Sequence, residues 1–175
     1  MEKLIWTDTE TTGINPGDIM EVGIEVTDFD LNVLDRYHAL VQYDPENLND
    51  FTRGMHKENG LIEDIENAGG GDHPLKVRDE VVSLLKMHQV DDNRKTLRLA
   101  GNNVRAFDGR FFDVVMPGIM SEVHYRELDI STLHEALYVA TGKDHRPDSE
   151  ATHRVFEDIA WSQRLWKIWR EVCGL

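Results

Sequence analysis

Two carboxylates near the N-terminus, Asp8 and Glu10, have the spacing of a pair that holds hard metal ions. Residues i and i+2 point to the same face of a strand, so both side chains can share or bridge cations such as Mg²⁺ or Mn²⁺. The segment Leu4 to Asp8 has the composition of a short buried strand, where charges are costly unless they are paired or bound to metal. Acidic residues are common in this chain, so a solvated strand end is the competing interpretation.

Two further groups are candidates for the same chemistry. His153 and Asp158 are separated by about 140° on an ideal helix, so they converge only if His153 lies at or before the first turn. Thr152 as the N-cap would place it there, whereas a surface histidine is the simpler interpretation. Asp108 follows a predicted strand at a helix start, where the helix dipole favours an acid even without metal.

The elements that must position these groups are those of an α/β protein. Three strands come first, and later helices alternate with strands, which predicts a mixed sheet covered by helices in one domain over residues 1–175. Ser131 is the expected cap of one helix, and Phe51 is expected in an exposed loop. The expected strands are 4–8, 19–26, 33–43, 96–100 and 125–130, and the expected helices are 58–68, 74–85, 107–115, 131–140 and 152 onward.

Charge and cysteine content limit the possible partners. The 175 residues include 33 Asp or Glu against 19 Lys or Arg, and the formal net charge is −14. Such a chain repels polyanions, which excludes a large basic groove for duplex DNA, although bound cations can reverse the field locally. The single cysteine, Cys173, excludes a disulfide framework and favours a reducing, cytoplasmic compartment. Because no apolar run approaches the roughly 18–20 residues of a membrane span, no membrane partner is expected.

In their order along the chain, the three groups resemble the motifs of the DEDDh 3′→5′ exonucleases, which have a ribonuclease-H-like fold. Residues 8–13, Asp-Thr-Glu-Thr-Thr-Gly, match the first motif of that superfamily, residues 101–112 look like the second, and residues 153–158 are similar to the third. Residues 124–133 are similar to the HYRxxDVST string of the oligoribonuclease family, and this likeness covers nearly the whole chain.

This resemblance implies a five-stranded mixed sheet and an exoribonuclease that degrades short oligoribonucleotides to 5′-mononucleotides. It implies a general base, His153, and two divalent cations, Mg²⁺ or Mn²⁺, held by Asp8, Glu10, Asp108 and Asp158. The implied substrate contacts are Ile14 and Phe51 at the terminal bases, His56, Arg126 and Ser131 at phosphates, Asn103 in the second motif, and Tyr125 across a homodimer interface.

Departures from the family pattern keep other functions open. Glu10-Thr11-Thr12-Gly13 is the form common in DNA-proofreading relatives, and Phe51 stands where the family has a tryptophan, which offers more stacking area. The main alternative is therefore a 3′→5′ exonuclease that acts on single-stranded DNA or longer RNA. An endonuclease of the ribonuclease H type, a glycosidase with paired carboxylates and a non-catalytic binding domain are further alternatives. Read alone, Phe51 and Tyr125 could be packing residues, Arg126 a solvated charge and Ser131 a cap.

Overall fold

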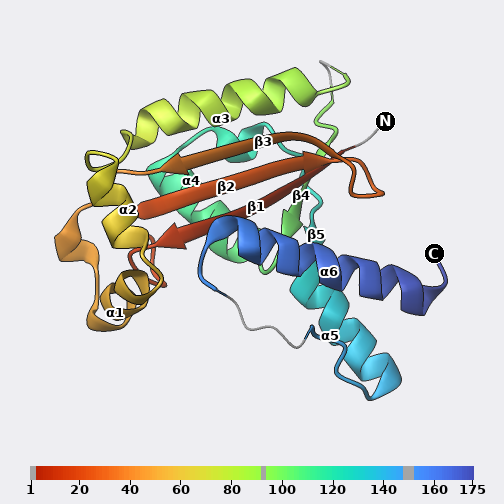
Figure 1. The fold of residues 1–175 in the computed structure, drawn as a ribbon. Helices are drawn as coiled ribbons and strands as arrows, with labels where there is room; N and C mark the ends of the chain where they lie inside the picture. The colour runs from red at the N-terminus through yellow and green to blue at the C-terminus, as the bar shows by residue number, and fades with distance from the viewer. Residues whose placement is uncertain (1–2, 92–93, 148–151) are drawn as a thin grey trace.

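A computed structural model describes residues 3–91, 94–147 and 152–175, which form a mixed five-stranded sheet with helices on both faces (Figure 1). The strand order is β3-β2-β1-β4-β5; β2 is antiparallel to β1 and β3, whereas β1, β4 and β5 are parallel. The predicted fold class is confirmed. The strands are β1 (Lys3–Thr11), β2 (Ile19–Thr27), β3 (Val33–Leu40), β4 (Leu97–Gly101) and β5 (Leu128–Asp129).

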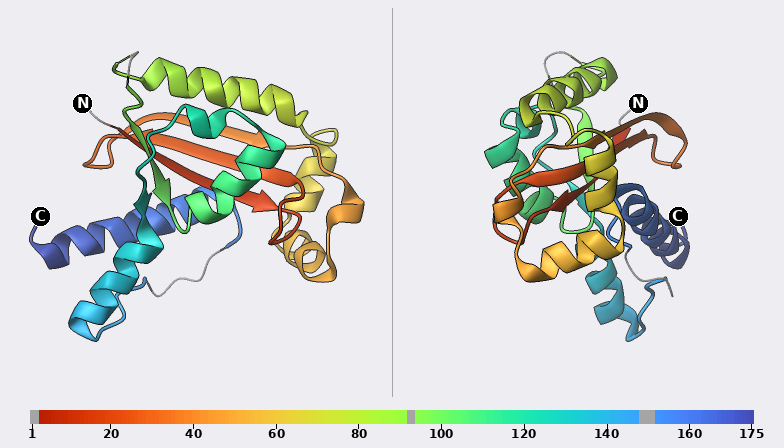
Figure 2. Two further views of the ribbon diagram at one scale, coloured as in Figure 1. Left: turned by 180° about the vertical axis from the view of Figure 1, so that it is seen from behind. Right: turned by 60° about the vertical axis from the view of Figure 1, so that its left-hand side comes forward.

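Helices α3 and α4 cover one face of the sheet, and α5 and α6 cover the other (Figure 2). The short helices α1 and α2 lie at the end of the sheet where β1 ends (Figure 1). None of the helices in the described part of the chain is long and apolar enough to cross a membrane. The α-helices are α1 (Asp50–Glu58), α2 (Leu61–Asn67), α3 (Pro74–His88), α4 (Arg110–Val115), α5 (Ile130–Thr141) and α6 (Val155–Cys173); η1 (Pro45–Asn47) and η3 (Ile119–Ser121) are 3₁₀ turns and η2 (Arg105–Gly109) is a π-helical turn.

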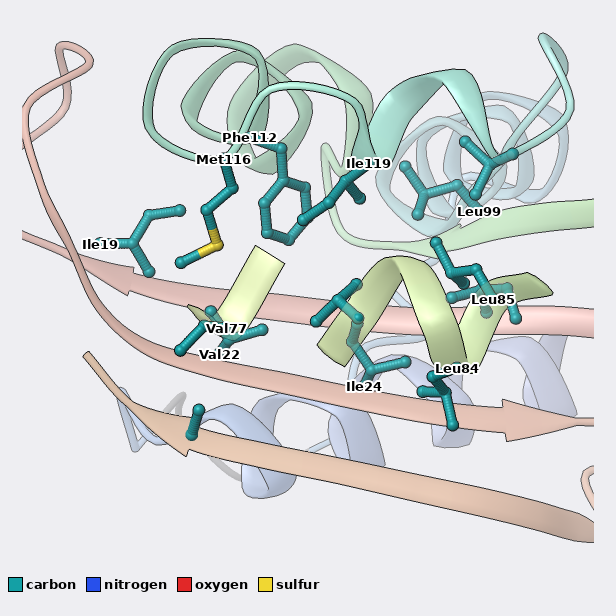
Figure 3. Close-up of a cluster of buried hydrophobic side chains, with 14 of the residues drawn as sticks. Ile19, Val22, Ile24, Val77, Leu84, Leu85, Leu99, Phe112, Met116 and Ile119 are labelled. Carbon is teal, nitrogen blue, oxygen red and sulfur yellow. The ribbon is translucent and has the colours of Figure 1, made fainter. Parts of the chain in front are cut away.

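Strand alternation divides β1 between two hydrophobic cores. Ile5 points into the core under α3 and α4, whose members include Val22, Leu85 and Phe112 (Figure 3). Leu4 and Trp6 point the other way and pack with residues of α5 and α6. Asp8 and Glu10 continue this second series, because every second residue of a strand faces the same side. The sequence thus brings both carboxylates to the α6 face of the sheet.

Several predicted boundaries are wrong, each because a local capping or pairing interaction differs from the expected one. Phe51 lies in helix α1, which Asn49 caps by accepting a hydrogen bond from Thr52 N–H, and not in a loop. Ser131 is not the cap of α5; Asp129 is, and it accepts from Thr132 N–H. The cap position of α6 is Arg154 and not Thr152. The remaining shifts are a fifth strand reduced to Leu128–Asp129, a third strand that ends at Leu40, and an α2 that begins only after Gly60.

A glycine on β2 lets the start of α6 approach the sheet. Gly23 is the cross-strand partner of Asp8. A Cβ at this position would lie 2.6 Å from the Val155 side chain and 3.3 Å from Ile159, so only glycine leaves room for the first turns of α6. Asp158 lies between these two residues in sequence, and its distance from β1 therefore depends on the contact over Gly23.

Replacement of Gly23 by alanine should lower both stability and activity. The added methyl group must push α6 away from β2, which is overpacking of the kind that costs about 1–3 kcal/mol of unfolding free energy. Gly54→Ala is the matched control, because a Cβ there meets nothing within 4 Å and helix α1 gains a better helix former. Urea unfolding and turnover of both variants test this, and a Gly23→Ala protein as stable and active as the parent would contradict the packing argument.

Candidate active site

A pocket of about 450 Å³ opens at the C-terminal end of β1. Its lining includes carboxylates together with apolar side chains of α1 and of the loop after β1. Its walls therefore combine groups that bind cations with surfaces that can contact a flat base. The lining residues are Asp8, Thr9, Glu10, Thr11, Gly13, Ile14, Asn49, Phe51, Thr52, Met55, Phe107, His153 and Asp158.

His153 and Asp158 converge on Glu10 although they are five residues apart in sequence. His153 precedes α6 in the left-handed backbone conformation, with φ at 54°, so its side chain is not bound to the helical spacing. Asp158 accepts a hydrogen bond from Thr152 N–H at 3.1 Å, which closes the turn around His153. One ligand atom from each of Glu10, His153 and Asp158 lies within 4.8 Å of the other two. The condition for this convergence is met, because His153 lies before the first turn of α6, although Thr152 is not the N-cap.

Asp108 reaches the cluster from η2, the π-helical turn that follows β4. Its side chain is buried and accepts a hydrogen bond from Thr9 Oγ1 at 2.7 Å. Thr9 lies between Asp8 and Glu10 on β1, so this bond ties η2 to the strand that carries the other acids. Asp108 is not among the residues that line the pocket, but it lies close enough for its charge to act on Asp8 and Glu10.

The four acids repel one another strongly when they are all ionised. Burial, followed by the charges of Asp108, Glu10 and Asp158, holds the pKa of Asp8 well above its usual range. Burial and the charges of Asp158, Glu21 and Asp108 raise the pKa of Glu10 to about 8. Burial also raises the pKa of Asp108 to about 7, against the hydrogen bond from Thr9, and raises that of Asp158.

This donor set fits divalent cations. The oxygen-rich cluster is the ligand type that hard ions prefer, and a bound cation would favour the ionised carboxylates against the burial and the mutual repulsion that raise their pKa values.

Raised carboxyl pKa values make the metal-free protein less stable at high pH. The pKa of Glu10 is 4.5 in the unfolded chain and about 8 in the folded protein. Between these two pH values the native state therefore binds more protons than the unfolded state. Stability should therefore fall as the pH rises from about 5 to 8 in chelator, with a Tm loss of at least about 5 °C. Thermal scans across this range test the sign; Mg²⁺ should restore the loss at pH 8, and Glu10→Gln should flatten the slope.

Two of the apolar side chains that line the pocket are strongly exposed. Ile14 is 77% exposed and Phe51 75%, a high value for such large hydrophobic groups in a folded chain. A hydrogen bond connects the two segments that carry these side chains. Thr52 Oγ1 donates to Thr12 O at 2.8 Å, which fixes α1 against the loop that carries Ile14. The structure thus brings Ile14 and Phe51 to the pocket that Asp8, Glu10 and Asp158 also line.

His56 lies behind the pocket wall and not at its surface. Its side chain is fully buried, and its Nε2–H donates to Thr11 O at 2.9 Å. Nδ1 lies 3.9 Å from Glu10 Oε2 and has no hydrogen-bond partner among the described residues. Burial lowers the pKa of His56, so the neutral ring is favoured. In this structure the histidine supports β1 beside Glu10 and offers no face to a phosphate.

The second group of candidate substrate contacts lies outside the pocket. Asn103 N–H donates to Ser131 Oγ at 3.1 Å, and the Ser131 hydroxyl donates to Asp129. Tyr125 is 72% exposed, and the Arg126 guanidinium stacks over its ring at 5.2 Å. The pocket that contains the acids is lined by none of the four candidates, which are Asn103, Tyr125, Arg126 and Ser131. One chain therefore brings together Ile14, Phe51 and the acidic set, but not Tyr125 or Arg126.

Comparison with known proteins agrees with this geometry. The family model described as "Exonuclease" matches residues 5–165. The oligoribonuclease of Leifsonia xyli is 31% identical over 97% of this chain and 83% of its own, and that of Chromobacterium violaceum is 35% identical over 89% of both chains. This chain belongs to the oligoribonucleases of the exonuclease family. As a member, it is a nuclease, and the resemblance seen in its motifs is confirmed.

Solved structures add evidence about the fold of this family member. Escherichia coli exonuclease I, crystallised with a dT13 oligonucleotide, superposes with a TM-score of 0.68 at 14% identity. The match covers 97% of this chain but only 41% of exonuclease I, so this chain spans less than half of that enzyme. At this identity the likeness concerns the fold alone, and it confirms the expected ribonuclease-H-like architecture.

Sequence reasoning missed several residues of this exonuclease site. Met55 and Phe107 line the pocket, and Thr9 holds Asp108. Thr9 lies inside the first motif and Phe107 inside the second, so their position within these motifs is the signal that could have identified them. Met55 could have been found only by recognising that Asn49 starts a helix, because it lies one turn beyond Phe51 on α1.

Proposed function

We propose that this protein is a 3′→5′ exoribonuclease that degrades short oligoribonucleotides to 5′-mononucleotides by phosphodiester hydrolysis with two divalent cations, Mg²⁺ or Mn²⁺. The observation that carries the proposal is the convergence of Glu10, His153 and Asp158 within 4.8 Å beside two exposed apolar side chains. The relatives named above are oligoribonucleases, which supports an RNA substrate.

Each residue has a distinct role in this proposal. Asp8, Glu10, Asp108 and Asp158 hold the two cations, which when bound supply the charge that favours attack and departure of oxygen at phosphorus. His153 accepts a proton from the attacking water at its imidazole nitrogen. Ile14 and Phe51 hold the last bases through contacts that every base offers, so hydrolysis is independent of sequence.

The net charge of −14 supports a short substrate. A long polyanion would meet repulsion from the acidic surface beyond the cation site, whereas a dinucleotide or trinucleotide stays within the pocket and its rim. A 3′→5′ exonuclease on single-stranded DNA or longer RNA is the second candidate, which the glutamate-threonine-threonine-glycine form of the first motif favours.

A substrate-length series separates the two candidates. RNAs of two to about twenty nucleotides, labelled at the 5′ end, and matched DNA strands are compared at equal concentration with Mg²⁺ and with Mn²⁺. The proposed function predicts the highest kcat/KM on the shortest RNAs and 5′-mononucleotide products. A rate that rises with length, or that is higher on DNA, would favour the second candidate, and cleavage of a circular strand would exclude both exonuclease assignments.

We also propose that the active form is a homodimer in which Tyr125 and Arg126 of one subunit contact substrate in the pocket of the partner. The compartment proposed for it is a reducing one such as the cytoplasm. Support comes from the exposure of Tyr125 and its absence from the pocket of its own chain. Ser131 and Asn103, which are bonded to each other, lie beside the same segment.

Subunit mixing tests the shared site. Asp8→Ala and Tyr125→Ala proteins should each be nearly inactive, and random exchange of their subunits should restore about a quarter of the sites, because half the dimers carry one intact pocket. An unchanged activity after verified exchange would place Tyr125 in the pocket of its own chain or outside the reaction.

A further inference from the structure

The backbone at His153 must be held by its surroundings. A φ of 54° is unfavourable for a residue with a Cβ, and such conformations persist only where neighbouring contacts fix them. Helix α6 begins only at Val155, so helical hydrogen bonds do not supply those contacts. Side-chain contacts must therefore keep the His153 turn in place.

Besides the bond that Asp158 accepts from Thr152 N–H, Arg154, the next residue, makes side-chain contacts that hold this turn. Its Nε and Nη2 donate to the two carboxylate oxygens of Glu21 on β2, both at 3.1 Å, and its Nη1 forms an ion pair with Asp64 of α2 at 2.9 Å. Asn59, which ends α1, donates from Nδ2 to the carbonyl oxygen of His153 at 2.5 Å. We call Arg154, Glu21, Asn59 and Asp64 the His153 clamp.

The clamp joins the His153 turn to the strand that carries the site. Glu21 has a side chain only 2% exposed and is the cross-strand partner of Glu10. Two buried glutamates on neighbouring strands repel each other, and the planar guanidinium of Arg154 binds one of them in a bidentate manner while leaving the other facing the pocket. His38 also contacts Glu21, at 2.7 Å from its Nε2, so the carboxylate that receives Arg154 is itself fixed.

We infer that Arg154 is a positioning residue that, through the bidentate pair with Glu21 and the bond from Asn59, holds the His153 imidazole toward Glu10 and Asp158. The inference rests on the proposed role of His153 in the reaction. Arg154 does not line the pocket and its guanidinium is occupied by protein carboxylates, so it acts through His153 and not on the substrate.

A double-mutant cycle with His153 distinguishes positioning from general structural support. Arg154→Gln should lower kcat by up to about 100-fold with a KM change within about threefold, and Arg154→Lys, which retains a cation for Glu21, should recover part of it. In a His153→Ala background, Arg154→Gln should cause little further loss, because the group that it positions is already absent.

Arg170→Gln is the control. Arg170 lies near the C-terminal end of α6, forms an ion pair with Asp30 at 3.1 Å and does not line the pocket. Its loss should leave kcat unchanged. Hydrogen exchange over residues 152–158 gives a reading independent of turnover: it should accelerate in Arg154→Gln and not in Arg170→Gln.

The outcomes separate the two proposals. A parent-like kcat in Arg154→Gln, or a full additional loss in the His153→Ala background, would overturn the positioning role while leaving the exonuclease assignment intact. A fully active His153→Ala protein would instead overturn the role of His153 in the proposed function, and the positioning role would fall with it.

Discussion

Replacing Asp158 by asparagine should lower kcat by about a thousandfold or more at saturating Mg²⁺. Asp158 is the only described acid that α6 contributes to the pocket, and one of its oxygens lies within 4.8 Å of ligand atoms of Glu10 and His153. Loss of its charge removes several kcal/mol of cation-mediated stabilisation, and each 1.36 kcal/mol is a factor of ten in rate.

The adjacent acid provides the control for this change. Glu157 is exposed, lies in the same first turn of α6 and does not line the pocket. Glu157→Gln removes the same charge from the same helix, so it should retain near-normal kcat. Single-turnover rates on a dinucleotide RNA, with calorimetric titration of Mn²⁺, measure both effects. Comparable activity in the two variants would mean that Asp158 is not a cation ligand.

His153→Ala should reduce kcat by about 10²–10⁴-fold, the usual contribution of a positioned general base. The geometry alone permits a second role, because the His153 ring nitrogen lies with Glu10 and Asp158 in a group that could bind a metal ion. The two roles differ in their effect on cation affinity. If His153 is only a general base, the His153→Ala protein should bind Mn²⁺ with an affinity within a few-fold of the parent. If His153 is a ligand, its loss should weaken Mn²⁺ binding strongly.

Calorimetry with Mn²⁺ therefore decides between the two roles of His153, independently of turnover. His145→Ala is the control, since that imidazole bonds to Thr141 near the end of α5 and does not line the pocket. A large loss of Mn²⁺ affinity in His153→Ala would identify the histidine as a ligand, and the proton acceptor would then have to be another group.

The succession of strands and helices along the chain and the shared face of Asp8 and Glu10 could be predicted, because both depend on local patterns. Alternation along β1 alone places the two acids with Leu4 and Trp6 on the α6 side. The convergence of His153 with Asp158 could not be derived from helical spacing, because it depends on a left-handed residue held by long-range contacts.

The helix that carries Phe51 could not be predicted from hydrophobic periodicity either. Its start depends on Asn49 acting as a cap, and the residues after it are polar enough to read as a loop. Tyr125 was expected in a strand, but only Leu128 and Asp129 pair with β4, because the parallel ladder there is limited to two residues. The errors therefore fall where capping or pairing, and not periodicity, sets the structure.

The contact of α6 with β1 has a consequence for biosynthesis. Asp8 lies on the first strand of the sheet and Asp158 follows 150 residues later, on α6, so the candidate hydrolytic centre cannot form on a nascent chain that contains the whole sheet but lacks α6. Chains fold progressively from the N-terminus during synthesis. The protein thus becomes competent to cut RNA only after α6 has been translated, has emerged from the ribosome and has packed against the sheet.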